Sequence, residues 1–206
     1  METRAIETVI KKLGQSGCYG NPKDYLAWVR ASGMPNVSDE EFTRVFNGLI
    51  QSGIVKKLES LTPTYKLNVT LSFPEQVEFV ASSSYEHFPI QLARSRLESY
   101  LNFHHLDQEN INLIIIGATE GFENAVKYNS GNNFTVRYRI SDNIFNMTVE
   151  NDMKYVSLEE NIAAGKFSST STLMRGMLVM NKVFDFMDLN FTSINEHAIL
   201  TVIKKL

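Results

Sequence analysis

The sequence predicts an α+β protein built from two modules. Three segments with helical spacing of apolar residues lie within residues 3–53, and two short strand-like segments follow them. Residues 69–206 then mix helical and alternating segments, which predicts a sheet covered by helices. A length of 206 residues with 43% apolar residues allows one large domain or two small ones. We expect a boundary between residues 68 and 69.

Composition narrows the class of protein. The net charge of −3 gives the whole chain no general attraction to nucleic acid or to acidic membranes. No apolar run approaches the roughly 20 residues that a membrane span needs, and the amphipathic start lacks the features of a signal peptide. Cys18 is the one cysteine, so an intrachain disulfide is excluded. We therefore expect a cytoplasmic protein that has no membrane partner.

The first module, residues 1–68, should hold three helices and a hairpin. Pro22 suits the first turn of the second helix and Gly33 its end. Ser38 and Glu41 form the pattern of a capping box at the start of the third helix. The predicted helices cover residues 3–14, 22–33 and 38–53, and the predicted strands cover residues 54–60 and 62–68.

The second module, residues 69–206, should begin with a connection that runs into a strand. Asp107 is a good N-cap for a long helix whose first half is apolar all round, so we expect that half to be deeply buried. Residues 151–172 have no strong period and should be mobile. The other predicted elements are helices at 88–101 and 173–187, a strand pair at 134–140 and 144–150, and a terminal hairpin at 189–193 and 197–206.

The long helix contains the stretch "ATEGFENAVKY", residues 118–128. Glu120 and Asn124 stand four residues apart in it, so a carboxylate and an amide share one helix face. Such a pair can hold a hydrated magnesium ion and activate a hydroxyl. It can equally be an ordinary polar edge on a half-buried helix.

The order of elements in residues 70–206 resembles the GHKL fold of sensor histidine kinases, Hsp90-type ATPases and gyrase-type ATPases. The chain is most similar to the bacterial anti-sigma-factor serine kinases, whose long helix typically carries Glu-x-x-x-Asn-Ala-x-Lys. That motif stands here as Glu120, Asn124, Ala125 and Lys127. The resemblance implies a mixed sheet with helices on one face. Three helices followed by a hairpin, with "LIQSGIVKKL" between them, resemble a winged-helix module.

The resemblance also implies roles for single residues. Asn124 would coordinate magnesium on the nucleotide phosphates, and Glu120 would be the catalytic carboxylate that orients or deprotonates the attacking hydroxyl. Lys127 would reach a phosphate. In "RGMLV", Gly176 keeps the first glycine of the phosphate-binding Gly-x-Gly, and Arg175 can add a phosphate ligand. The cofactors implied are ATP and magnesium.

The chain departs from the family pattern where the adenine base would bind. The family's Asp-x-Gly is replaced by Asn151 and Met153, and an amide accepts a hydrogen bond more weakly than a carboxylate. The alternative register gives the role to Asp152 but puts Lys154 at the glycine position. Leu178 also replaces the second glycine of Gly-x-Gly. We expect weak or degenerate ATP binding.

Three functions follow as hypotheses. The first is a bacterial-type signalling regulator that binds a protein partner, by resemblance a sigma factor or an anti-anti-sigma-like regulator, with a homodimer also open. The second is an active Mg-ATP-dependent protein serine kinase. The third is a DNA-binding regulator that uses the first module, although the third helix there begins with acidic residues that repel phosphate. The candidate DNA contacts are Arg44, Lys56, Lys57 and Lys66.

Overall fold

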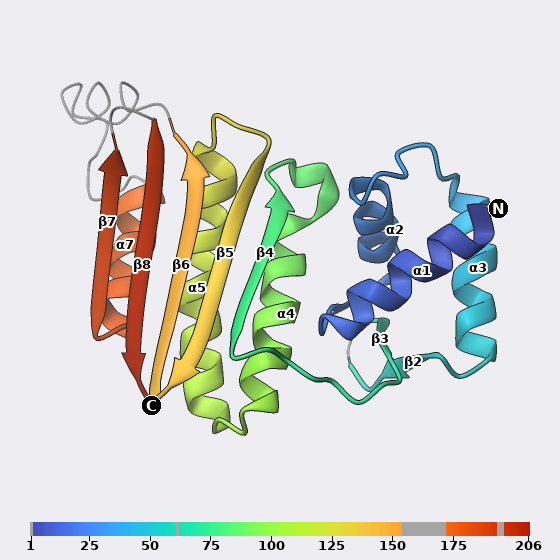
Figure 1. Ribbon diagram of the computed structural model, residues 1–206, viewed down its shortest axis with the longest axis horizontal. Coiled ribbons are helices and arrows are strands. Elements are labelled where there is room, and N and C mark those ends of the chain that lie inside the picture. The colour runs from blue at the N-terminus through green and yellow to red at the C-terminus, as the bar shows by residue number, and fades with distance from the viewer. Residues whose placement is uncertain (1, 61, 154–171, 193–195) are drawn as a thin grey trace. The chain divides into compact units, whose positions relative to one another are not determined.

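The computed structural model describes residues 2–60, 62–153, 172–192 and 196–206 (Figure 1). The chain divides into two compact units. The first unit comprises residues 1–73 and 85–105, and the second comprises residues 74–84 and 106–206. The protein is therefore of the α+β class, with both helices and antiparallel sheets.

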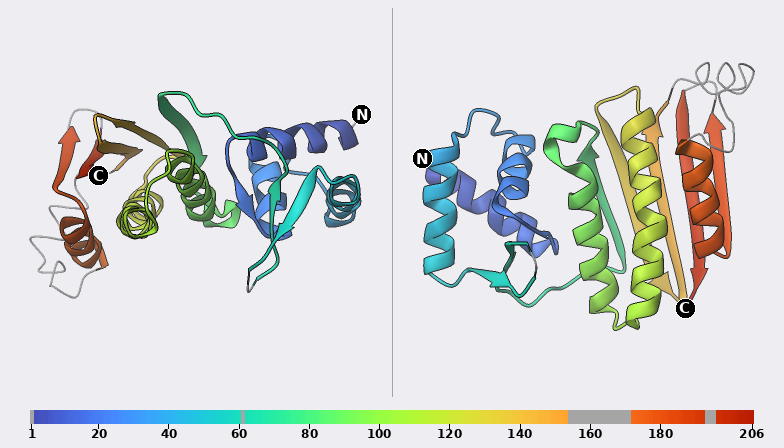
Figure 2. Two further views of the ribbon diagram at one scale, coloured as in Figure 1. Left: turned by 90° about the horizontal axis from the view of Figure 1, so that it is seen from below. Right: turned by 180° about the vertical axis from the view of Figure 1, so that it is seen from behind.

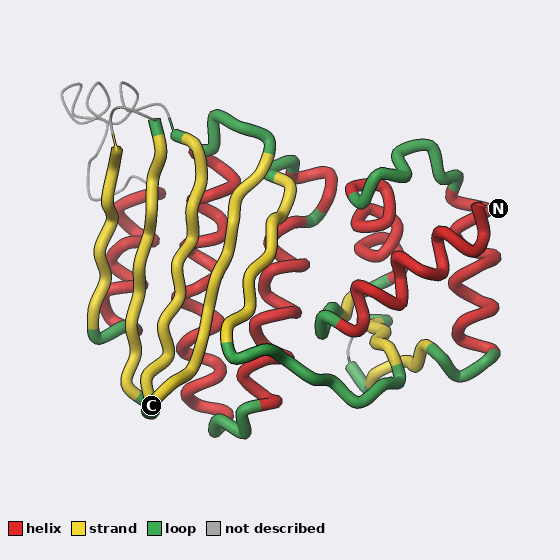
Figure 3. The backbone as a smooth tube through the Cα atoms, in the orientation of Figure 1, coloured by secondary structure: helices red, strands yellow, loops and turns green. Residues whose placement is uncertain are grey.

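The first unit combines helices with a small antiparallel sheet, whose strands are yellow in Figure 3. The strand order is β1-β3-β2, so the last strand lies in the centre. The three predicted helices and the predicted hairpin are present, and β1 is an additional strand. The elements are α1 (Glu2–Gln15), β1 (Tyr19–Gly20), α2 (Pro22–Ala31), α3 (Asp39–Gln51), β2 (Val55–Leu58), β3 (Thr64–Leu67), a short 3-10 helix (Tyr85–His87) and α4 (Pro89–Phe103).

Local side-chain hydrogen bonds define where the helices of the first unit begin. The Asn21 side chain accepts from the backbone N–H groups of Lys23 and Asp24, and the Asp24 carboxylate accepts from the Asn21 N–H. The Ser38 hydroxyl accepts from the Glu41 N–H at 3.1 Å, which confirms the predicted N-cap of α3.

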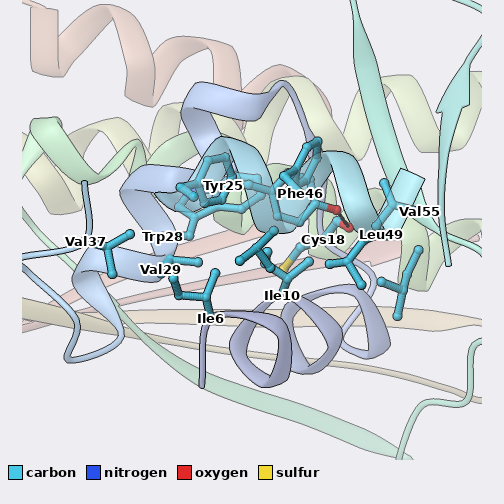
Figure 4. Close-up of a cluster of buried hydrophobic side chains, with 13 residues drawn as sticks. Ile6, Ile10, Cys18, Tyr25, Trp28, Val29, Val37, Phe46, Leu49 and Val55 are labelled. Carbon is cyan, nitrogen blue, oxygen red and sulfur yellow. Dashed lines mark hydrogen bonds between the residues drawn. The ribbon is translucent and has the colours of Figure 1, made fainter. Parts of the chain in front are cut away.

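Aromatic and aliphatic side chains from α1, α2 and α3 form the core of the first unit (Figure 4). The Phe46 ring packs against Phe42 and Tyr25 with centroids 5.2 and 5.3 Å away. The Tyr25 hydroxyl donates to the Cys18 carbonyl at 3.0 Å. Burial raises the pKa of the Cys18 thiol to about 12, so this cysteine is a core residue rather than a nucleophile.

Helix α4 belongs to the first unit. The Ser99 hydroxyl donates to the Gly17 carbonyl at 2.7 Å, and the Trp28 indole N–H donates to the Phe88 carbonyl at 3.3 Å. The division of the chain thus differs from the expected single boundary after residue 68, because residues 85–105 group with the preceding module. That residues 1–68 and residues 70–206 can be separated stays a prediction.

The second unit is a five-stranded sheet with helices α5 and α7 on one face (Figure 2). The strand order is β4-β5-β6-β8-β7. The Asp107 side chain accepts from the Asn110 N–H at 2.8 Å and starts α5 as predicted. The elements are β4 (Gln76–Ser82), α5 (Gln108–Tyr128), β5 (Asn133–Ser141), β6 (Ile144–Asp152), α7 (Thr172–Val183), β7 (Phe186–Thr192) and β8 (His197–Lys205).

The expectation of a mixed sheet was wrong. All four neighbouring strand pairs of the five-stranded sheet are antiparallel. The β5–β6 and β7–β8 pairs are hairpins, which are antiparallel by construction. The strands that α7 connects, β6 and β7, run in the same direction, but β8 lies between them and pairs with both.

Two finer expectations in the second unit were also wrong. The last helix ends at Val183 rather than near Met187, because Phe186 and Met187 pair with β8 as part of β7. The first half of α5 is not buried all round, since Ile116 is 53% exposed. The predicted mobile segment at residues 151–172 lies, apart from its ends, outside the described residues. In the described part of the chain, no helix has the length and apolarity to cross a membrane.

Gly117→Ala should destabilise the second unit. A Cβ atom at this position would lie 2.5 Å from Cε2 of the buried Phe184 ring and 3.1 Å from Cγ1 of Val183. We expect a loss of about 1–3 kcal/mol in the free energy of unfolding, measured by urea denaturation. Gly48→Ala in α3 is the matched control, because its Cβ would meet nothing within 4 Å, and it should gain about 0.5–1 kcal/mol. Equal effects of the two substitutions would contradict the packing at Gly117.

A fragment of residues 1–105 should be more stable than a fragment of residues 1–68. The shorter fragment lacks α4 and so loses the partners of Gly17, Tyr19 and Trp28. Urea denaturation of each fragment, monitored by circular dichroism, gives the two midpoints to be compared. Equal midpoints would show that α4 contributes nothing to the first core and would support a boundary at residue 68.

Candidate functional site

Helices α5 and α7 bring three of the predicted site residues together. Glu120 and Asn124 lie one turn apart on α5, as their spacing predicts, and Gly176 of α7 lies against both. A Cβ atom on Gly176 would stand 2.8 Å from Oε2 of Glu120 and 3.3 Å from Nδ2 of Asn124. The absence of a side chain at position 176 therefore lets the α7 backbone rest directly on the polar pair. Their predicted roles in catalysis and nucleotide binding stay predictions.

Glu120 is in an unfavourable setting for a charge. Burial raises the pKa of its carboxyl group, and repulsion from Glu123 on the same helix raises this pKa further. Attraction to the exposed Arg175 of α7 acts in the opposite direction. Arg175 thus lies close enough to interact with the carboxylate, while Gly176, its neighbour in the chain, makes the close contact.

A small cavity lies between α5, α7 and the sheet. Its volume is about 40 Å³, whereas sites for small molecules usually enclose about 300–1,000 Å³. Asn124 and Tyr128 line it from α5, and the strands and α7 close it with apolar side chains. Those apolar residues are Val149, Met153, Met177, Met180, Met187, Leu189 and Leu200. In this conformation the cavity has room for about one water molecule.

The two residues predicted for the adenine end, Asn151 and Met153, also line this cavity. The Asn151 side chain is buried, and its Nδ2 donates to the Asp152 carbonyl at 3.1 Å. The Met153 side chain is buried, and its backbone N–H donates to the Glu196 carbonyl at 2.6 Å. A thioether chain therefore occupies space where the family pattern has a glycine.

The alternative register gives the role of adenine acceptor to Asp152, which does not line the cavity, and that role stays a prediction. β6 alternates between the two faces of the sheet, and Asn151 points to the helix side. Asp152 points to the opposite face, where its Oδ1 lies 3.3 Å from Nδ1 of His197. His197 also lies 3.9 Å from the Glu150 carboxylate, so its contacts are with acidic groups on the outer face.

Lys127 does not join the cavity. Its side chain is exposed and its Nζ lies 5.2 Å from the centre of the neighbouring Tyr128 ring, within cation–π range. Among the described residues, no group of three or more His, Cys, Asp or Glu side chains can hold a metal ion. The role of Asn124 toward magnesium would therefore depend on the nucleotide phosphates.

The candidate DNA contacts fall on different surfaces of the first unit. Lys56 and Lys66 face each other directly across β2 and β3 on one side of the small sheet. Lys57 pairs with Tyr65, whose ring packs against Phe46 in the core, so Lys57 belongs to the other side. Arg44 is exposed on α3. The first residue of that helix, Asp39, accepts a hydrogen bond from Arg30 at 2.8 Å.

Three of the four cavity methionines were missed from the sequence, which singled out Met153 alone. Met177 and Met180 stand three residues apart in α7, and Met187 follows in β7. Their spacing in "MLVM" is a helical signal, but the pattern cannot tell an apolar stripe that fills a pocket from one that lines it. Gly121, which lies beside Glu120 in the sequence, was the better signal of tight packing around the cavity. A glycine inside a helix often marks a place where another segment approaches the helix closely, and here Leu200 does so.

Comparisons with known proteins found no matching family model and no matching curated protein. Among solved structures, the chain is similar to the crystal structure of the RsbU and RsbW domains of Rv1364c from Mycobacterium tuberculosis. The TM-score is 0.49 and the sequence identity 12%. The match covers 69% of this chain and 35% of that one, so this chain corresponds to about a third of its neighbour.

Glu120→Gln should stabilise the protein at neutral pH. A raised pKa means that the folded state holds the carboxyl proton more tightly than the unfolded state, so ionisation at pH 7 costs stability. The amide removes that cost. The gain in the free energy of unfolding should shrink as the pH falls toward about 4, where the unfolded carboxyl group is itself protonated.

Urea denaturation at a series of pH values measures this difference. Glu109→Gln is the matched control, because Glu109 is exposed in the first turn of the same helix and favours the helix dipole. It should give no gain at pH 7. A loss of stability in Glu120→Gln at pH 7 would show that the carboxylate is favourably paired in the fold.

Proposed function

We propose that the chain is a signalling regulator of the bacterial anti-sigma-factor type that acts by binding a protein partner and has little affinity for ATP. The proposal rests on one observation above all. Helix α7 is packed onto Glu120 and Asn124 through Gly176, and the remaining cavity measures about 40 Å³. A cavity of this size, among the described residues, leaves little room for a nucleotide and so supports weak ATP binding.

The apolar lining of the cavity supports weak nucleotide binding. Opening a site of ligand size would require α7 to separate from α5 and would expose the buried Met180 and Val183. Returning apolar surface to water costs about 25 cal/mol per Å². Nucleotide contacts would have to offset this cost before any net affinity appeared.

The adenine end adds a second penalty. An adenine amino group would meet the Asn151 amide oxygen in place of a carboxylate, and an amide oxygen is the weaker acceptor. That loss costs about 1–3 kcal/mol, or one to two decades in affinity. Met153 also adds a buried side chain at the position where the resemblance implies a glycine, which supports weak binding of the base.

Exposed apolar residues on the helices support a role in protein binding. Ile116 on α5 is 53% exposed and Leu178 on α7 is 51% exposed. A protein partner would cover such exposed apolar side chains, and Arg175 and Glu120 on the same two helices could add charged contacts. By resemblance, the partner is a sigma factor or an anti-anti-sigma-like regulator, or a second copy of the chain, in the cytoplasm.

The first unit has the element order of a winged-helix module, and we assign it a protein-docking role rather than a DNA-reading one. The order β1-β3-β2 with three helices supports the winged-helix assignment. Helix α3 would be the reading helix, but its first turn is Asp39, Glu40 and Glu41. Carboxylates at that end repel the phosphate backbone.

An active serine kinase is the second candidate, because Glu120, Asn124 and Gly176 are still assembled at one place. The costs of opening the cavity and of poorly pairing the adenine amino group argue against it. Calorimetry with ATP separates the two functions. A kinase must bind ATP with magnesium, whereas a regulator that has lost the nucleotide site need not.

The unmodified chain should bind ATP weakly, and Asn151→Asp with Met153→Gly should raise its affinity at least tenfold. The carboxylate restores the acceptor for the adenine amino group, and the glycine frees the space that Met153 fills. Isothermal calorimetry with and without magnesium measures both effects. In the double-mutant background, Asn124→Ala should abolish the magnesium dependence.

Asp152→Asn is the matched control, because this neighbour lies on the outer face of the sheet and should leave ATP binding unchanged. Asn151→Asp alone keeps Met153 in the core and covers the case in which the double mutant is too unstable. Tight magnesium-dependent binding by the unmodified chain would overturn the proposal in favour of the kinase.

A further inference from the structure

The first unit contains a hollow of about 800 Å³ beside the outer face of its small sheet. Strands β2 and β3 form one wall, and the loop after α1, the segment after β3 and the last turns of α4 form the others. All of the residues that line it belong to the first unit. Its volume is within the range of about 300–1,000 Å³ that is usual for small-molecule sites.

Two lysines stand side by side on one wall of this hollow. Lys56 and Lys66 are direct cross-strand partners in the β2–β3 pair, and both are exposed. Like charges directly opposite each other destabilise a strand pair. Among the described residues, no carboxylate forms a salt bridge with either ammonium group. An anion placed between them would relieve this repulsion.

Several apolar side chains line the other walls. Val69 and Phe103 are each 41% exposed, and Leu58 and Leu71 also line the hollow. The Phe103 ring is held in place by an edge-on contact with Phe73, with centroids 5.3 Å apart. These side chains leave apolar surface in water that an aliphatic chain would cover.

Two hydroxyl groups that line the hollow are already paired within the protein. The Tyr19 hydroxyl donates to the Glu98 carboxylate, and the Ser99 hydroxyl donates to the Gly17 carbonyl. Two ammonium groups and one carboxylate leave a net charge of +1 in the hollow, with His105 counted as neutral. This charge suits a monoanion better than a phosphate dianion.

We propose that this hollow binds an anionic amphiphile, namely an aliphatic carboxylate of the medium-chain fatty acid class. The carboxylate lies between Lys56 and Lys66, and the chain lies against Leu58, Val69, Leu71 and Phe103. This site is in the first unit and does not depend on the function proposed for α5 and α7.

Calorimetry on the full chain with decanoate tests the site. Butyrate has the same head group without the long chain, and decyltrimethylammonium has the same chain with the opposite charge. Decanoate should bind, and both other probes should bind at least tenfold more weakly. Equal binding of decanoate and decyltrimethylammonium would show a non-specific apolar surface and overturn the proposal, as would the absence of decanoate binding at millimolar concentration.

Variants locate the head group. Lys56→Gln and Lys66→Gln should each weaken decanoate binding about tenfold, and Phe103→Ala should weaken it without changing the preference for an anion. Lys57→Gln is the matched control, because Lys57 neighbours Lys56 in β2 but does not line the hollow. Thermal unfolding checks that each variant is folded.

A short random DNA duplex serves as the competing probe. The proposal is wrong if two results occur together. In the first, Lys56→Gln, Lys57→Gln and Arg44→Gln all reduce a salt-dependent affinity for the duplex to the same extent. In the second, Lys56→Gln leaves decanoate binding unchanged, so that the lysines bind nucleic acid instead. A loss of decanoate binding in Lys56→Gln and Lys66→Gln, with Lys57→Gln unchanged, is the result we expect.

Discussion

The close approach of α7 to α5 is the constraint on which the second unit depends. Two glycines make it possible, since Gly117 meets Phe184 and Val183 and Gly176 meets Glu120 and Asn124, while Gly121 lets α5 approach Leu200 of the sheet. At none of these positions is there room for a Cβ atom without a shift of its neighbours. The same approach decides how much space is left between the helices and the sheet, and therefore what the site can hold.

Because of this packing, the residue types of the motif do not by themselves decide what the site can bind. Glu120 and Asn124 lie one turn apart on α5, and the backbone of α7 lies against them at Gly176. Four methionines line the cavity beside them. Because methionine is unbranched and flexible, such a lining can repack more easily than one of leucine or isoleucine. The cavity between the helices and the sheet is therefore lined in part by flexible side chains that fit irregular gaps well.

Periodicity and capping predicted most helices and strands of this chain, because both are local signals. Ser38 and Asp107 mark helix starts that the structure confirms. The two-residue strand β1 was missed, since two residues have no period. The antiparallel arrangement of the sheet was missed because strand order depends on contacts between distant segments. The proximity of Glu120, Asn124 and Gly176 followed from the motif and the order of elements, whereas the size of the cavity depends on side-chain packing that no spacing reveals.

The burial of Trp28 gives the chain an optical asymmetry. It is the one tryptophan of the sequence, it is 1% exposed in the core of the first unit, and its indole N–H donates to the Phe88 carbonyl at the start of α4. The second unit contains none. Emission excited at the red edge of the indole band therefore reports on the first unit alone, while backbone dichroism reports on both. The two signals separate the unfolding of the two cores within one intact molecule.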